Sequence, residues 1–264
     1  MMNTDEKARK YIHKLNQYQT LVRQFVEDEI YPHRIECSFE ALNDWSLHNS
    51  LDDVYDWFSN KRISCDMEVF DIPLKETKGW YIDKNTGNVH HESKDFFVVH
   101  GVRTTTSSRE TGHGWDQPIL EQIGYDGGLL GIIRQKYSGV PHYLCEAKME
   151  PGNYGKVQLS PCLQATFSNI AKIHGGRKPH FLEIFENLDN NPIGFRTLFD
   201  AWLAEDGGRL NLKRNRGILV EVPEDFEIKI PNSNFIWLSL YQIKRLLLED
   251  AWVNPHIRGI LAHV

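Results

Sequence analysis

Three charged side chains follow one another at every second position near the middle of the chain. Glu146, Lys148 and Glu150 alternate with apolar residues, which is the pattern of a strand with one dry and one polar face. The three charges therefore share one face of the predicted strand. A lysine between two carboxylates favours their ionised form, so one carboxylate can serve as a general base and the lysine as a hydrogen-bond donor.

A second alternating run extends from Val157 to Phe167 and follows turn residues at positions 151–155. We expect a hairpin that brings both polar faces to the same side. Neutral hydrogen-bonding groups suit the hydroxyls and carbonyls of a ligand, and they occupy the polar positions of this run: Gln158, Ser160, Gln164, Thr166 and Ser168, followed by Asn169. Two alternatives stay open, namely an ordinary solvated sheet face and a helix that begins at Ser160 and ends at Gly175.

Basic side chains beside paired glycines offer contacts for a phosphate. The segment HGGRKPH carries His174, Arg177 and Lys178, so backbone amides and cations can approach a phosphate together. Arg103, at the start of a long polar loop, is a further candidate for an anion contact. A solvated charge is the alternative for each cation. The sequence contains neither of the glycine-rich phosphate motifs GxxxxGK[ST] and GxGxxG, and it has no GxSxG nucleophile motif.

The composition bounds the class of protein. With 264 residues, 41% of them hydrophobic and 25% charged, the chain can bury a sizeable core. A formal charge of −6 argues against binding to nucleic acid or to a membrane surface, because such binding needs a clustered positive face. The polar N-terminus and the lack of a long apolar run predict a cytoplasmic protein. Four cysteines without CxxC pairs, and histidines without HxxxH spacing, give no support for a metal site.

The chain divides into an N-terminal helical region, residues 1–62, and a β-rich domain, residues 63–264. Residues Thr4–Ile30 have apolar side chains at helical spacing, which predicts one long helix that acts as a packing or dimerisation arm. Ser50 is expected to cap a further short helix. In the β-rich domain, the pattern also predicts an amphipathic helix over Pro192–Glu205.

Two further features of the β-rich domain concern its hairpins and its last helix. Residues Leu129–Lys136 and His142–Met149 are predicted to pair through a turn at 137–140. Gly217–Ile230 is expected to form a hairpin broken at Pro223. Ser239 with Gln242 forms the capping-box pattern that opens the final helix.

Several long segments of the chain resemble the NDP-hexose 2,3-dehydratase family of deoxysugar biosynthesis. The resemblance covers most of the chain from about residue 34 onward. Its central and most specific segment holds the two alternating runs: AKMEPGNYGKVQLSPCLQATFSN, followed by HGG. It is supported by TGNVHHESKDFFVVHGV, by WDQPILEQ at Trp115–Gln122, and by IWLSLYQIKRLLLEDAWVN at Ile236–Asn254.

The resemblance implies a Nudix-like α/β fold, with a mixed or antiparallel sheet, flanking helices and an N-terminal helical arm. It implies elimination of the C2 hydroxyl from a 4-keto-6-deoxyhexose linked to dTDP or UDP, with no cofactor. Members of the family carry two tandem copies of the domain, whereas this chain has one. We therefore expect a homodimer that rebuilds the paired arrangement; alternatively, a single copy marks a subgroup with a different substrate or reaction.

The implied reaction also suggests a role for each candidate residue. A C4 ketone acidifies the C3 proton, so the site needs a base, a donor to the enolate oxygen and an acid for the leaving hydroxyl. Our order of candidates for the base is Glu150, Glu146 and His174, with Lys148 as a donor. The expected substrate-binding residues are Gln158, Ser160, Gln164, Thr166, Ser168, Asn169 and Trp115, with Arg103, Arg177 and Lys178 on the diphosphate.

Two other functions stay open. A different transformation next to a carbonyl, such as isomerisation or epimerisation, would use the same base and the same binding face. A non-catalytic protein that binds sugar nucleotides would use the binding face alone. The sequence lacks the REx2EE helix that holds magnesium in Nudix hydrolases, so pyrophosphate hydrolysis is not expected.

Overall fold

The computed structural model describes residues 3–26, 32–94, 96–105, 108, 112–123, 127–166, 170, 178–190 and 192–264. None of the helices in this part of the chain is long and apolar enough to cross a membrane. The helices are α1 (Thr4–Val22), α2 (Pro32–Glu40), α3 (Leu51–Ile63), α5 (Leu182–Glu186), α6 (Leu240–Leu246) and α7 (Pro255–Leu261). The strands are β1 (Trp80–Ile82), β2 (Val89–His91), β3 (Phe97–Arg103), β4 (Asp116–Gln122), β5 (Gly128–Tyr137), β6 (Val140–Met149), β7 (Val157–Pro161), β8 (Leu163–Thr166), β9 (Arg196–Ala204), β10 (Leu210–Asn211), β11 (Arg214–Val222) and β12 (Phe235–Leu238).

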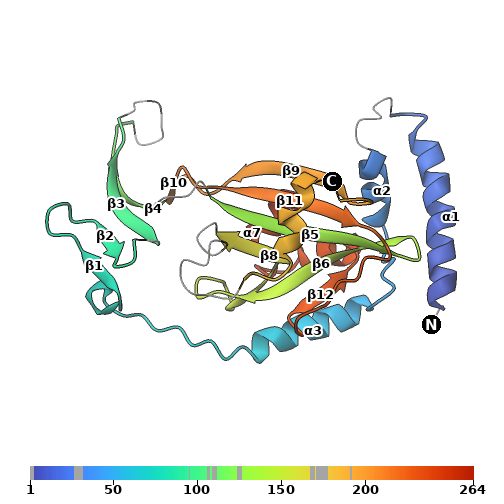
Figure 1. The fold of residues 1–264 in the computed structure, drawn as a ribbon, viewed down its shortest axis with the longest axis horizontal. Helices are drawn as coiled ribbons and strands as arrows, with labels where there is room; N and C mark the ends of the chain where they lie inside the picture. The colour runs from blue at the N-terminus through green and yellow to red at the C-terminus, as the bar shows by residue number, and fades with distance from the viewer. Residues whose placement is uncertain are drawn as a thin grey trace.

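The centre of the molecule is a mixed sheet with the strand order β12-β6-β5-β11-β9, to which β7 and β8 are added (Figure 1). The predicted hairpin of β5 and β6 is confirmed, and its turn residues Ser138 and Gly139 both have positive φ, at 48° and 80°. Two such residues form the tight turn whose twist matches paired strands. β11 runs parallel to β5 and antiparallel to β9. The expected mixed sheet with flanking helices is therefore confirmed.

The second alternating run does not form one continuous strand. β7 pairs with the end of β6, whereas β8 pairs with the start of β5, so the two short strands fill the gap where β5 and β6 diverge. Cys162 lies at the bend between them. The expectation of unbroken alternation is wrong here, because changing partner strand at a bend shifts the side-chain register by one residue. The alternative of a helix beginning at Ser160 is also wrong.

Helices cover both faces of the sheet. On one face, α3, α6 and α7 supply Phe58, Ile243 and Ile260 to a buried cluster that includes Leu130 and Ala147. On the other face, α5 contributes Leu182 and Phe185 to a second cluster, with Leu144 and Ile133. α1 packs mainly through Ala8, Tyr11 and Leu15 against Phe39 and Trp45.

Two predicted helices differ from the structure. The first helix ends at Val22, before the predicted end at Ile30, and Phe25 beyond it is 78% exposed. The predicted helix over Pro192–Glu205 is wrong, because Arg196–Ala204 forms strand β9, which pairs with residues 214–221 of β11. This tertiary pairing outweighs a helical pattern that the segment also satisfies. For the same reason the predicted hairpin over Gly217–Ile230 is wrong: β11 pairs with β9 and β5.

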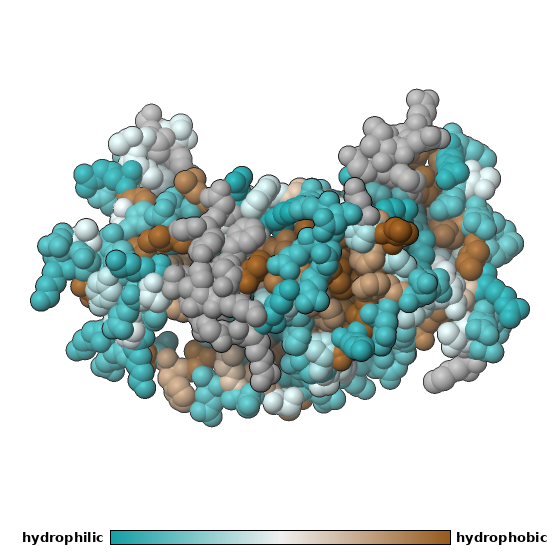
Figure 2. Space-filling view, viewed as in Figure 1, coloured by the Kyte–Doolittle hydropathy of each residue, from teal (hydrophilic) through white to brown (hydrophobic). Residues whose placement is uncertain are grey.

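A smaller sheet, in the order β1-β2-β3-β4-β10, lies to one side of the central sheet (Figure 1). It joins the rest of the fold through β10, which runs parallel to β4. An extended segment, residues 64–73, connects α3 to this sheet along the lower edge of the view. Figure 2 shows the same face: the outer surface of α1 is mostly hydrophilic, and hydrophobic residues appear over the middle of the molecule.

Candidate functional site

A cavity of about 280 Å³ lies between the central sheet, the start of α7 and the small sheet. Its apolar wall includes Phe97, Leu130 and Leu210. Its polar residues come from segments far apart in the sequence, namely the ends of β6 and β9, strand β8, the start of β11 and the first turn of α7. They are Glu150, Gln164, Thr166, Glu205, Lys213, Asn215 and His256.

On the sheet side of the cavity, Gln164 orients a carboxylate. Its amide Nε2 donates to Glu150 Oε1 at 2.9 Å, and its Oε1 lies 3.4 Å from the donor Nδ2 of Asn254. The register places Gln164 opposite Leu130, whose side chain packs in the cluster under α7. The shift at Cys162 therefore turns Gln164 toward the cavity, where it can hold Glu150 in place.

On the opposite side, His256 forms a pair with a carboxylate. Its Nδ1 lies 3.4 Å from Glu205 Oε1, and the same oxygen accepts a hydrogen bond from Asn215 Nδ2. Lys213 Nζ in turn donates to Asn215 Oδ1 at 2.8 Å. The result is a connected row of one cation, one amide, one carboxylate and one imidazole. Such a row fixes the orientation of each side chain in the cavity.

Burial shapes the protonation of this row. Removal from water lowers the pKa of the His256 imidazole, although the nearby carboxylates of Glu205 and Glu150 oppose the change. Burial also lowers the pKa of Lys213, against the attraction of Glu205. His256 is therefore neutral near pH 7, which leaves a ring nitrogen able to accept a proton.

The first turn of α7 places His256 at the cavity. Asn254 caps this helix by accepting a hydrogen bond from the Ile257 N–H at 3.1 Å, and Pro255 is its first residue. Asn254 Nδ2 also donates to Ser160 Oγ at 2.7 Å, and its N–H donates to the carbonyl of Leu159. The start of the helix is therefore fixed to β7 and β8.

The other predicted residues of the two strands lie apart from this cavity. Glu146 and Lys148 follow Leu144 at two-residue steps within β6, so they face the side of the sheet that α5 covers. Glu150 lies beyond the end of β6 and lines the cavity, so the expectation that the three charges share one face is wrong for Glu150. Lys148 Nζ lies 3.8 Å from Glu146 Oε2, and burial raises the pKa of Glu146. Gln158 donates to the carbonyl of Ala251 at 3.0 Å. Gln158 pairs with Lys148, so the expectation that both polar faces share one side is confirmed for Gln158. The expectation is wrong for Gln164, which lies opposite Leu130.

Ser160 is fully buried, so its hydroxyl supports the start of α7 and is shielded from a ligand in the cavity. Thr166, the last residue of β8, lines the cavity. Four predicted residues lie outside the described part of the chain: His174, Ser168, Asn169 and Arg177.

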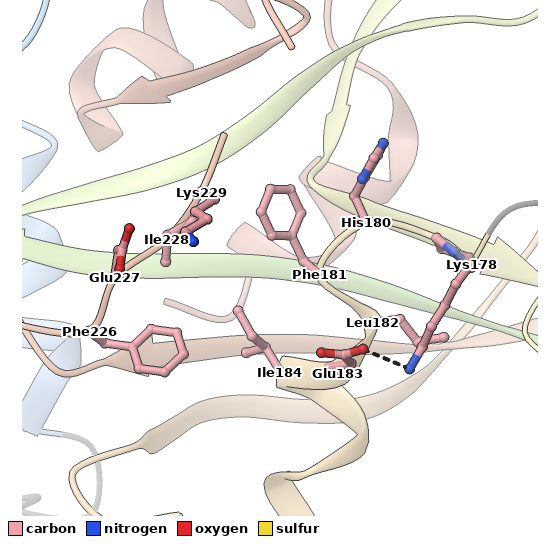
Figure 3. A pocket seen from close by; sticks show the side chains of 11 residues that line it. Lys178, His180, Phe181, Leu182, Glu183, Ile184, Phe226, Glu227, Ile228 and Lys229 are labelled. Atoms are coloured by element: carbon pink, nitrogen blue, oxygen red, sulfur yellow. Dashed lines mark hydrogen bonds and ion pairs between the residues drawn. The ribbon is translucent and has the colours of Figure 1, made fainter. Parts of the chain in front are cut away.

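The predicted residues at a greater distance are engaged in contacts of their own. Trp115 Nε1 donates to Gln117 at 2.8 Å, and Arg103 forms two hydrogen bonds with Asp116, on the small sheet. Lys178 lines a second cavity of about 340 Å³. Figure 3 shows its ammonium turned toward Glu183, 3.3 Å away, and it is also paired with Glu186 at 3.2 Å.

Sequence reasoning missed Glu205, Lys213, Asn215 and His256. Glu205 was placed in a helix, and the other three carry no motif of their own. One signal did exist: Asn254-Pro255 is the N-cap and first-residue pattern of a helix, which places His256 in its first turn.

The model of the NDP-hexose 2,3-dehydratase family matches residues 51–264. The chain belongs to this family. Over 215 residues it is 36% identical to the dTDP-4-dehydro-6-deoxy-alpha-D-glucopyranose 2,3-dehydratase of Amycolatopsis orientalis, and over 206 residues it is 35% identical to the protein of the same name from Streptomyces violaceoruber. These matches cover 80% and 78% of this chain but 44% of each relative. The chain therefore spans less than half the length of these curated dehydratases, and every described residue of the cavity lies within the part that the family model matches.

Two solved structures are similar to this dehydratase-family chain at a low level. An ADP compounds hydrolase aligns with a TM-score of 0.35 and 13% identity, covering 63% of this chain and 82% of its own. A Nudix hydrolase from M. Smegmatis, RenU, aligns with a TM-score of 0.30 and 11% identity, covering 62% of this chain and 96% of its own.

Proposed function

We propose that this protein is a sugar-nucleotide dehydratase that eliminates the C2 hydroxyl of a dTDP-linked 4-keto-6-deoxyhexose. Family membership supports the reaction class, and the names of its relatives support the substrate. The observation that carries the proposal is the cavity in which Glu150, Lys213 and His256 converge. Elimination next to a ketone needs a base, a cationic or hydrogen-bond donor and an acid, and groups able to take these roles line one cavity.

The cavity suits the sugar for physical reasons. Thr166 and the Glu150–Gln164 pair offer hydrogen bonds to hydroxyls, and Phe97 with Leu210 provides an apolar wall for the carbon skeleton. We assign Lys213 to the enolate oxygen, because an ammonium in a partly dehydrated site stabilises developing negative charge. Comparing turnover of the dTDP- and UDP-linked sugars decides which nucleotide is preferred.

The test is turnover of dTDP- and UDP-linked 4-keto-6-deoxyglucose, followed by NMR in deuterated water. We expect loss of the C2 hydroxyl. A product that keeps this hydroxyl but is isomerised or epimerised would show a different reaction, and a thermal shift with the sugar nucleotide without turnover would show a binding protein.

A pair of matched variants tests the location of the site. Glu150→Gln removes a charge from the cavity, whereas Glu146→Gln removes the same charge on the other side of the sheet. We expect kcat/KM to fall by about tenfold or more for Glu150→Gln, and by less than about threefold for Glu146→Gln. The reverse order would move the site to the α5 side of the sheet.

We also propose that two copies of the chain associate, and that the protein acts in the cytoplasm. The extended segment before β1 supports association: Phe70 and Ile72 are 74% and 53% exposed, and Leu74, directly after the segment, is 64% exposed. In the described part of the chain, no backbone hydrogen bond holds residues 65–72. Exposed apolar side chains on an extended segment are typical of an interaction surface. Light scattering that finds a monomer at micromolar concentration would contradict a homodimer. The boundary between the N-terminal helical region and the β-rich domain, placed between residues 62 and 63, stays a prediction.

A further inference from the structure

His256 is held in the cavity from one side only. Its Nδ1 faces Glu205 Oε1 at 3.4 Å, and Glu205 accepts a hydrogen bond from Asn215, to which Lys213 donates in turn. Among the described residues, no hydrogen bond occupies the other ring nitrogen, Nε2, and the side chain lines the cavity. A carboxylate close to Nδ1 favours the tautomer with the proton on that nitrogen, which leaves the lone pair on Nε2.

The charges around the ring favour a neutral imidazole that can become an imidazolium. Glu205, from the end of β9, and Glu150, from the end of β6, stabilise the protonated ring, whereas Lys213 and Lys148 oppose it. Burial disfavours the charged form and lowers the pKa. A base with a pKa below neutrality is available in its active form at pH 7, and the two carboxylates stabilise the ion that it becomes.

We propose that His256 is the catalytic base of the elimination and also the acid for the leaving hydroxyl, with Glu205 as its positioning residue. This inference rests on the proposed function and deepens it. His256 thus replaces Glu150 as the group that takes the C3 proton, while Glu150 keeps a role in holding the substrate.

The proton and the electron pairs balance without another reactant. His256 Nε2 takes the C3 proton, and the C–H electron pair forms the enolate across C3 and C4. When the C4 ketone forms again, the C2–C3 double bond appears and the C2–O bond breaks. The leaving oxygen keeps that electron pair and takes the proton from Nε2, so water departs and the imidazole is neutral again. C2 and C3 are neighbours, so one group on one face of the sugar can serve both steps.

The contacts of Glu150 distinguish it from a base of this kind. One of its oxygens already accepts a hydrogen bond from Gln164, which is linked to Asn254 at the start of α7. Among the described residues, no hydrogen bond or ion pair joins the Glu150 carboxylate to a second carboxylate or an imidazole that would orient it as a proton carrier. Its arrangement suits a fixed hydrogen-bond acceptor for a sugar hydroxyl.

The first test compares His256→Asn with a control just beyond the other end of α7, His263→Asn, an exposed residue stacked on Phe199. We expect kcat to fall by roughly 10²–10⁴-fold for His256→Asn, with nucleotide binding unchanged, because general acid–base catalysis contributes about that much. We expect His263→Asn to keep wild-type activity. Imidazole added to His256→Asn is expected to restore part of the rate.

The second test uses the pH profile of Glu205→Gln, which a merely structural role would not shift. Removing the carboxylate lowers the pKa of His256 further, so the acidic limb of kcat/KM moves to lower pH as the maximum rate falls. An unshifted limb would overturn the positioning role.

If the wild type turns over substrate and His256→Asn stays within threefold of it, His256 is not the base, and the proposed function stands. If the wild type itself shows no turnover of any 4-keto sugar nucleotide, the proposed function fails.

Discussion

A buried arginine joins the N-terminal helices to the central sheet. Arg134, on β5, is fully buried, and its Nη2 lies 2.7 Å from Glu36 Oε2 and 2.6 Å from Glu40 Oε1, both on α2. Its Nη1 contacts Glu221 on β11. Tyr143 Oη accepts a hydrogen bond from Arg134 Nε and donates one to Glu40 Oε2. One cation is therefore shared by three carboxylates in a site that excludes water.

Replacing Arg134 with Met tests how much this network contributes to stability. Methionine fills a similar volume but leaves the three carboxylates without their shared partner. Lys136 reaches Glu36 at 2.9 Å and Arg196 reaches Glu221 at 2.9 Å, whereas Glu40 keeps, among the described residues, only the hydrogen bond from Tyr143. Removing one partner from a buried ion pair typically costs about 3–5 kcal/mol, so we expect a loss of about that size in the free energy of unfolding.

The assay is equilibrium unfolding in urea at pH 7, with Arg196→Met as the control. Arg196 pairs with the same Glu221, but its side chain is 48% exposed, so its loss is expected to cost less than about 1 kcal/mol. Adding Glu40→Gln to Arg134→Met removes the unpaired charge and is expected to recover part of the loss. If Arg134→Met costs no more than Arg196→Met, the buried network contributes no more than a surface pair, and this reasoning is refuted.

Two further predictions concern pH and packing. Burial lowers the pKa of His142 to about 3, and its Nε2 accepts a hydrogen bond from the N–H of Leu47. Below pH 6.5 the unfolded chain therefore binds a proton at this histidine that the folded chain does not. For this group the free energy of unfolding should decrease by about 1.4 kcal/mol for each unit that the pH is lowered, or by about 2 kcal/mol at pH 5. A plot of the free energy of unfolding against pH, from 7 to 4, should be flatter by this amount for His142→Gln than for the wild type. An equal slope would contradict the assignment. A Cβ at Gly131 would lie 2.3 Å from the ring of Phe185, so Gly131→Ala should cost about 1–3 kcal/mol in the same assay. Gly152→Ala, with nothing within 4 Å of the added atom, should change stability by less than about 0.5 kcal/mol, and equal losses would refute the steric explanation.

Local patterns predicted the elements whose causes are local. The β5–β6 hairpin follows from two alternating runs and a turn at Ser138-Gly139. Ser50 caps α3 and the capping box at Ser239 forms, both as predicted, because each depends on residues only three positions apart. Ser239 opens α6, although α7 follows it as the last helix of the described chain. Family membership was likewise visible in continuous segments.

The candidate site was only partly visible in the sequence. Glu150, Gln164 and Thr166 were recognised from the alternating runs, and they line the cavity. The partner carboxylate and imidazole, Glu205 and His256, were not recognised, because they lie 55 and 106 positions after Glu150 by subtraction of their residue numbers. Nothing in a local pattern relates positions so far apart.

The sequence by itself determined that β6 and β7 form a hairpin with Glu146, Lys148 and Gln158 on one face, since alternation within a strand is a local property of the backbone. Only the tertiary structure decided which polar residues meet. The bend at Cys162 moves β8 from β6 to β5 and turns Gln164 to the other side, and the pairing of β9 with β11 brings Glu205 to His256. Both depend on which strands lie side by side, and that choice is made by burial of the whole core, which no single stretch of sequence contains.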